Sequence, residues 1–131
     1  MNPKVIEESI ALSLAAKIKF PEVVKRLQAE GIERYIFDLV GLKVHFFSTN
    51  SEFYTLSLAY KATPVALHFD AASVEKSVAS RQKGEITYVQ FLDQIIAAGC
   101  THYEVYIAGK KVIYFGREGS QHIQLFPGVK P

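Results

Sequence analysis

The sequence predicts an α+β fold: two internally duplicated helix–helix–strand–strand–strand (ααβββ) units that share one mainly antiparallel sheet, with the helices on one face. Two observations lead to this fold class. Matching residues recur at an offset of 68 residues, the separation of Gly31 and Gly99. Within each unit, apolar residues change from helical spacing to a period of two. The units cover approximately residues 2–59 and 70–127 of a single domain spanning residues 1–131.

The internal repeat requires no gap. Segments 20–47 and 88–115 share seven identities at this offset, where chance would produce roughly one or two. Two copies are too few for a solenoid, which stacks three or more repeats, so we expect two halves around one core. The identical pairs are Ala29/Ala97, Gly31/Gly99, Tyr35/Tyr103, Gly41/Gly109, Lys43/Lys111, Val44/Val112 and Phe47/Phe115.

The first half begins with two predicted helices. Asn2 is a suitable N-cap and Pro3 suits the first helical position, where its missing N–H is not needed. A second helix starts at Phe20-Pro21 and ends where Gly31 supplies a left-handed C-cap. The apolar stripes of these helices are Ile6, Ile10, Leu14 and Ile18, then Val23, Val24 and Leu27.

The second half repeats this pattern. Asp70 caps a helix that ends near Gly84, and Thr87 with Gln90 has the spacing of a capping box for a helix that closes at Gly99. The apolar stripes are Val74 and Val78, then Phe91, Leu92, Ile95 and Ile96.

Strands are predicted from alternation. Gly41 and Gly109 are placed at tight hairpins that need a positive φ, leading into strands Val44–Phe47 and Val112–Phe115. Segment Val65–Phe69 is either a short strand or a buried linker. The buried faces of the first strand in each half are Tyr35, Phe37 and Leu39, and Tyr103, Val105 and Ile107; third strands are expected at Tyr54–Leu58 and His122–Phe126.

Composition excludes several classes of protein. The net charge is only +2, which disfavours nucleic-acid binding. The apolar fraction of 49% disfavours a disordered tail. The single cysteine cannot form an internal disulfide, which suits a reducing compartment. Neither a signal peptide nor a membrane span is recognisable, so a cytoplasmic location without membrane association is expected.

The chain resembles a known family in its structural residues. The segment Tyr88 to Phe115, with Ala97-Ala98-Gly99 and His102 to Tyr106, is similar to small bacterial and prophage proteins of domain of unknown function family 1398. Members are often labelled "phage envelope protein". The resemblance also takes in Phe20-Pro21, Gly31-Ile32-x-Arg34-Tyr35 and Tyr54-Thr55-Leu56. It implies an α+β fold with an internal repeat and carries no catalytic signature.

Metal and nucleophile motifs are missing from the sequence pattern. The four histidines have no helical ligand spacing, so no metal site or cofactor is expected. Cys100 follows a predicted helix C-terminus, where the helix dipole disfavours a thiolate, which favours a small buried role. Gly116 to Ser120 lacks the Gly-Lys-Ser/Thr of a phosphate loop and is interpreted as a hairpin loop.

The candidate site is the sheet face that helices would leave open. A polar open face can bind a ligand, a partner protein or a second copy of the chain. The simpler alternative is that this face only contacts solvent. We therefore expect a non-catalytic binding or interaction domain, with a possible homodimer. Two alternatives stay open: a small hydrolase or isomerase with a His102/Glu104 acid–base pair, and a phage structural protein. The candidate residues are Arg34, Asp38, His102, Glu104, Tyr106 and His122.

Overall fold

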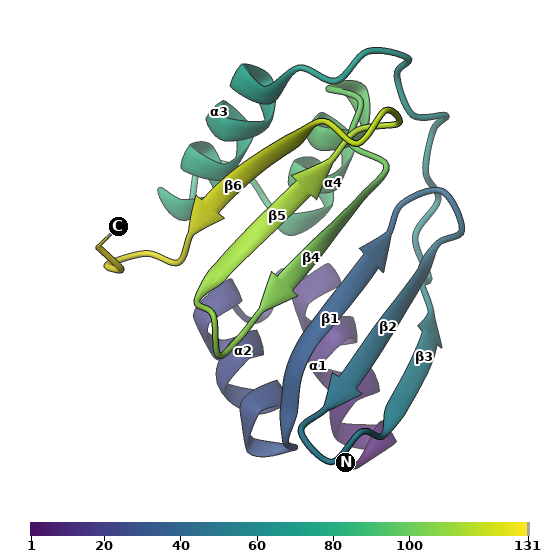
Figure 1. Cartoon of the computed structure of the whole chain (residues 1–131), viewed down its shortest axis with the longest axis vertical. Coiled ribbons are helices and arrows are strands. Elements are labelled where there is room, and N and C mark those ends of the chain that lie inside the picture. Colours follow the sequence, from purple (N-terminus) through teal and green to yellow (C-terminus); the bar gives the residue numbers. More distant parts are fainter. Residues whose placement is uncertain (131) are drawn as a thin grey trace.

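Four helices cover one face of a six-stranded antiparallel sheet in the computed structural model, which describes residues 1–130 (Figure 1). The predicted α+β class is confirmed. The strand order is β3-β2-β1-β4-β5-β6, so β3 and β6 form the two edges. The elements are α1 (Pro3–Leu14), α2 (Phe20–Ala29), β1 (Ile32–Asp38), β2 (Lys43–Ser48), β3 (Phe53–Ser57), α3 (Ala71–Gln82), α4 (Tyr88–Ala97), β4 (His102–Tyr106), β5 (Lys111–Phe115) and β6 (Gln121–Leu125).

The element bounds agree with the offset seen in the sequence. The bounds of α3, α4 and β6 lie 68 residues after those of α1, α2 and β3. At the centre of the sheet β1 pairs antiparallel with β4, and Ile36 lies opposite Glu104, its counterpart at the same offset. That the two halves superpose about a twofold axis through this pair stays a prediction.

The strand register agrees with the predicted alternation. Tyr35 and Phe37 of β1 and Tyr103 and Val105 of β4 are buried under the helices, and their neighbours on the other face are partly exposed. The buried residues of both halves join in one hydrophobic cluster. Burial of apolar area in this cluster is the main stabilising contribution to the fold.

Two helix starts have the predicted caps. The Asn2 side chain accepts a hydrogen bond from the Lys4 N–H at 3.0 Å. Thr87 and Gln90 form both arms of the capping box. The stripe predicted for the first helix is too long, because α1 ends at Leu14 and Ala16 has a φ of 59°, which places Ile18 in the following loop.

The predicted role of the hairpin glycines is wrong. The positive φ values occur one residue later, at Leu42 (55°) and Lys110 (54°). The glycines instead provide space for close contacts. A Cβ at Gly41 would lie 2.6 Å from Asp38 Oδ2, and one at Gly109 would lie 3.2 Å from Tyr106 Cβ.

The segment between the halves is a linker with no strand. Residues 58–70 contain no helix or strand, and Val65 is buried. Hydrogen bonds attach the linker to the second half: the Ala66 N–H donates to the Ile96 carbonyl at 3.1 Å, and Arg117 Nη2 donates to the Val65 carbonyl at 2.6 Å. Of the two predicted alternatives, the linker is therefore the one observed.

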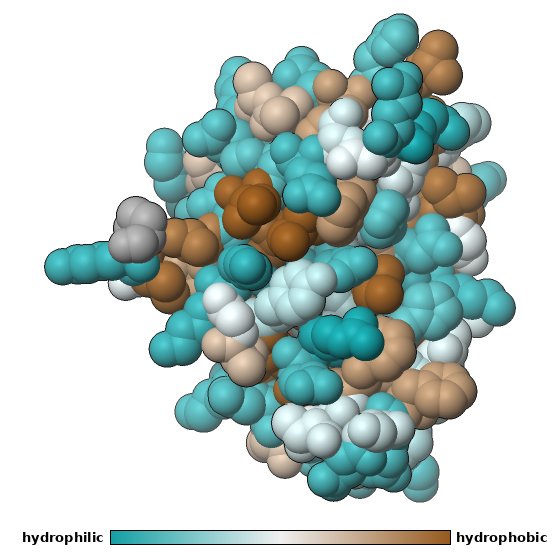
Figure 2. Space-filling model, viewed as in Figure 1, coloured by the Kyte–Doolittle hydropathy of each residue, from teal (hydrophilic) through white to brown (hydrophobic). Residues whose placement is uncertain are grey.

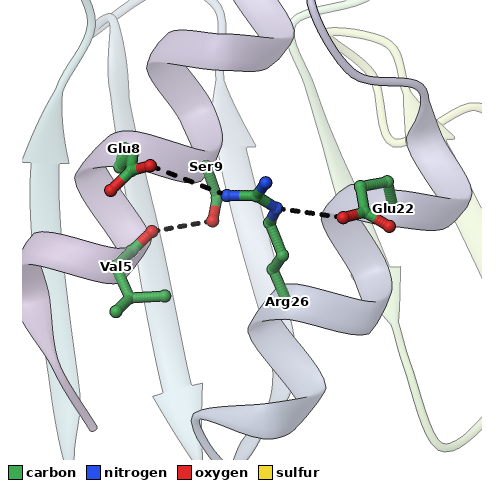
Figure 3. Close-up of polar contacts among 5 residues, drawn as sticks. All are labelled: Val5, Glu8, Ser9, Glu22 and Arg26. Carbon is green, nitrogen blue, oxygen red and sulfur yellow. Dashed lines mark hydrogen bonds and ion pairs between the residues drawn. The ribbon is translucent and has the colours of Figure 1, made fainter.

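Helices α1 and α2 are joined at their surface by Arg26 (Figure 3). Its guanidinium lies 3.2 Å from Glu22 within α2 and 3.8 Å from Glu8 of α1. The Arg26 side chain is 33% exposed and both glutamates are more exposed, so each pair contributes at most about 1 kcal/mol. Apolar packing of α1 on α2 is therefore the main attachment, and it holds α1 in place over the sheet.

None of the four helices in residues 1–130 has the length and the apolar character that a membrane span requires.

Candidate functional site

Five of the six predicted site residues lie together at the centre of the open sheet face. Arg34 is opposite Tyr106, and Asp38 is opposite His102, on the paired strands β1 and β4. Glu104 lies between them, opposite Ile36. All five are partly exposed. The expected cluster on neighbouring strands is therefore present.

The polar groups of this cluster are already engaged with neighbours. Asp38 Oδ1 accepts hydrogen bonds from the Val40 and Gly41 N–H groups at 2.9 and 3.0 Å, which fixes the β1–β2 hairpin. The Arg34 guanidinium lies 3.9 Å from the centre of the Phe47 ring, and the Glu104 carboxylate accepts a hydrogen bond from the Tyr106 hydroxyl. Much of the cluster is therefore explained by contacts within the sheet itself, without a ligand.

His122, the sixth predicted residue, is on the opposite face. It lies across from the buried Tyr114 on β5, and the two rings are stacked at 6.2 Å. Its inclusion in an open-face site is therefore wrong. The reason is register, because β6 starts at Gln121 and the even-numbered residues of this strand share the face of Val112 and Tyr114.

The side chains of the predicted acid–base pair, His102 and Glu104, are each engaged with other neighbours in the structure. His102 Nδ1 is 2.9 Å from Thr101 Oγ1, and the His102 ring stacks on Phe115 at 4.6 Å. No hydrogen bond between His102 and Glu104 is found among residues 1–130. Within the same residues, no three His, Cys, Asp or Glu side chains are placed to share a metal ion.

Apolar side chains also gather on the open face. Figure 2 shows a hydrophobic patch over β5 and β6 within a largely hydrophilic surface. Ile123 of β6 is 53% exposed, and it lies opposite Ile113 of β5. Phe53 of β3 is exposed at the other edge of the sheet. The open face therefore has apolar edges around a polar centre.

A cavity of about 440 Å³ lies on the other side of the sheet, between the strands and the helices. Its volume falls within the usual range of small-molecule sites, roughly 300–1,000 Å³. Apolar and aromatic side chains form most of its wall. They include Ile10, Val23, Phe37, Val78, Ile86, Phe91, Val112, Leu125 and Phe126.

The mouth of the cavity is formed by loops. The exposed lining residues Ala16 and Lys19 follow α1, Gly84 and Thr87 follow α3, and Pro127 follows β6. Ala16 and Gly84, which are 68 residues apart, both adopt a positive φ, of 59° and 73°. The two chain reversals therefore have the same backbone conformation, and both line the cavity.

Tyrosine hydroxyls and one guanidinium are among the polar groups that line the cavity. The hydroxyls of Tyr88 and Tyr103 are hydrogen bonded to each other. Tyr35 and Tyr114 also line the cavity, and no hydrogen bond of their hydroxyls to residues 1–130 is found. Arg81 of α3 completes the set, with its guanidinium 4.1 Å from the centre of the Tyr88 ring.

Burial keeps these tyrosines protonated. Desolvation raises the pKa of Tyr88 to about 12 and also raises the pKa values of Tyr35, Tyr103 and Tyr114, while the positive charge of Arg81 opposes each rise. Near neutral pH the four hydroxyls are therefore neutral and able to donate hydrogen bonds. The described lining contains no His, Cys, Asp or Glu that could act as a general base.

The family of the chain can be stated from comparison with known proteins. A family model described as "Protein of unknown function (DUF1398)" matches residues 7–123. The chain belongs to this family. No curated protein matches it. The match includes all or part of every helix and strand, and most of the cavity lining.

Sequence reasoning missed the cavity in this DUF1398 protein, although two signals were present. Arg81 continues the spacing of Val74 and Val78 along α3, so a cation occupies a position on the buried helix face. Tyr88 and Tyr114 replace Phe20 and Phe46 of the first half at the 68-residue offset. Each replacement adds a hydroxyl to a core position, where such a group needs a partner.

The predicted buried role of Cys100 in the DUF1398 chain is confirmed. The side chain is fully buried, and its thiol donates to the His102 carbonyl at 3.3 Å. Burial raises the pKa of the thiol to about 12. The thiolate is the reactive form, so Cys100 is a packing residue rather than a nucleophile.

Proposed function

We propose that this chain is a non-catalytic binding domain for a small molecule, and that the cavity between the helices and the sheet is its site. The cavity supports this proposal because it combines an apolar wall, a mouth formed by loops and a few convergent polar groups. The proposal keeps the binding function expected from the sequence and moves the site to the opposite face of the sheet. Catalysis is not part of the proposal.

A variant that fills the mouth tests the proposal. Ile86 is partly buried at the entrance, so Ile86→Trp should obstruct the cavity with little disturbance of the core. We expect compounds from a panel of small aromatic acids, amides and amines to raise the melting temperature of the wild type but not that of this variant. Differential scanning fluorimetry measures the shift.

Leu67→Trp is the matched control, because Leu67 is exposed on the linker and does not line the cavity. This control should respond like the wild type. If Ile86→Trp does not fold, Ile18→Trp at the equivalent loop position takes its place. The proposal is wrong if no compound of the panel stabilises the wild type, or if the blocked variant responds equally.

The open face supports a second proposal, that two copies of the chain associate through it. The face carries the exposed Ile123 and both signs of charge, with Arg34 and Glu104 on adjacent strands. Two copies related by a twofold axis can bury the apolar part and pair opposite charges. A structural role in a phage particle and a cytoplasmic location stay predictions from the resemblance and the composition.

Light scattering during size-exclusion chromatography tests the association. We expect a dimer for the wild type and a monomer for Ile123→Lys, because a lysine at the interface would bury an unpaired charge. Leu67→Lys adds the same charge away from the open face and should stay dimeric. A wild type that is monomeric at millimolar concentration contradicts the proposal.

A further inference from the structure

The polar part of the cavity has an arrangement that points to the charge of its ligand. Arg81 has no carboxylate within 4.0 Å among residues 1–130, where the only arginine in a salt bridge is Arg26. Its guanidinium is in contact with rings instead, 4.1 Å from the centre of Tyr88 and 5.2 Å from that of Phe91. A cation held against aromatic faces keeps its hydrogen-bond donors available for a ligand.

The tyrosine hydroxyls add neutral donors beside this cation. Tyr35 and Tyr114 line the same cavity, and every fully buried side-chain nitrogen or oxygen among the described residues has a partner. The Tyr35 and Tyr114 hydroxyls form no hydrogen bond with residues 1–130, so their oxygens are not fully buried and keep access to the cavity space. Hydroxyl and guanidinium donors that line one cavity match an anion with several acceptor lone pairs.

The remaining wall has a different character. At the 68-residue offset the counterpart of Arg81 is Ser13, which is buried and also lines the cavity. The flanking pair Ile10 and Val78 and the loop pair Ile18 and Ile86 are apolar on both sides. The cavity therefore has a cation at Arg81 and an uncharged side chain at the equivalent position of the first half. Lys19, the other cation of the lining, is exposed at the mouth.

We infer that the ligand is a small organic monoanion with a flat apolar body, whose carboxylate binds Arg81 and the neighbouring tyrosine hydroxyls. The guanidinium offers two parallel N–H groups, the geometry that a carboxylate accepts. The aromatic and aliphatic wall then contacts the body of the ligand. This inference rests on the proposed function, since it specifies the ligand of the same cavity.

Calorimetric titration with three compounds of the same shape tests the inference. The probes are 2-naphthylacetate, its neutral amide and 2-(2-naphthyl)ethylamine. We expect the wild type to bind the acid roughly tenfold to a hundredfold more tightly than the amide, the usual effect of a charge-assisted hydrogen bond, and the amine most weakly. Arg81→Met keeps the apolar stem of the side chain and should remove the preference for the acid while the amide binds as before.

Two variants provide controls. Arg34→Met removes the same charge from the opposite face of the sheet and should leave the preference intact, whereas Arg81→Lys should retain part of it. Equal binding of acid and amide by the wild type overturns the inference and leaves the proposed function standing. An acid preference that survives in Arg81→Met also overturns it. If none of the three probes binds the folded wild type, the inference fails, while the proposed function still stands or falls by the thermal-shift panel and the Ile86→Trp variant.

Discussion

Replacing Gly99 by alanine is expected to destabilise the protein by about 3 kcal/mol or more, while Gly31→Ala should cost only about 1 kcal/mol. Both glycines end a helix with a positive φ, of 88° and 79°, so both substitutions carry the strain of a left-handed residue. Their surroundings differ. A Cβ at Gly99 would lie 2.2 Å from the His68 carbonyl oxygen, whereas one at Gly31 would have nothing within 4 Å.

Urea unfolding of the two variants measures this difference. Position 31 is a matched control, because it occupies the place in the first half that Gly99 occupies in the second. The extra cost at Gly99 comes from backbone of the linker, which cannot move away without loss of its hydrogen bonds to Ile96 and Ala98. Equal free energies of unfolding for the two variants would mean that the linker is not held against α4.

Truncation of Tyr103 to alanine is expected to cost about 3 kcal/mol, the usual cost of removing a buried aromatic ring. The ring is 4% exposed and stacks on Phe37 at 5.0 Å. Its loss would also leave the Tyr88 hydroxyl without its partner. Tyr103→Phe keeps the ring and should cost only about 1 kcal/mol, the contribution of one hydrogen bond.

Glu104→Ala is the control for this measurement. The side chain points to the open face and is partly exposed, so we expect a cost below about 0.5 kcal/mol in the same urea titration. A slip of one residue in the register would reverse the two results, because it moves every side chain to the other face. A costly Glu104→Ala beside a harmless Tyr103→Ala would therefore contradict the strand assignment.

Local patterns were sufficient to predict most of the secondary structure. The helix caps, the apolar stripes of α2 and α4 and the alternation in β1 and β4 each depend on residues within a few positions of one another. The 68-residue offset then related the halves, so their common element order followed. Errors arose at chain reversals. The φ of Leu42 and Lys110, and the early end of α1 before Ile18, depend on close contacts that no periodicity records.

The candidate site was less predictable for a physical reason. A cavity is space that packed elements fail to fill, so it depends on how four helices and a sheet fit together and not on any one segment. Arg81, Tyr35 and Tyr114 are far apart in the sequence and approach one another only in the folded chain. The open-face cluster was found because its residues lie on two paired central strands, while His122 was misplaced because β6 lacked a clear alternating pattern.

The position of the cavity between the halves has a consequence for how specificity can evolve. In a symmetric homodimer of a single half, every residue at the shared boundary would occur twice, so an arginine on one wall would require a second one facing it. Within one chain the two sides mutate independently: the residue 68 positions before Arg81 is Ser13, which also lines the cavity. A cavity formed within one chain can therefore have a polar end and a nonpolar end. A ligand bound in it would have a single preferred direction.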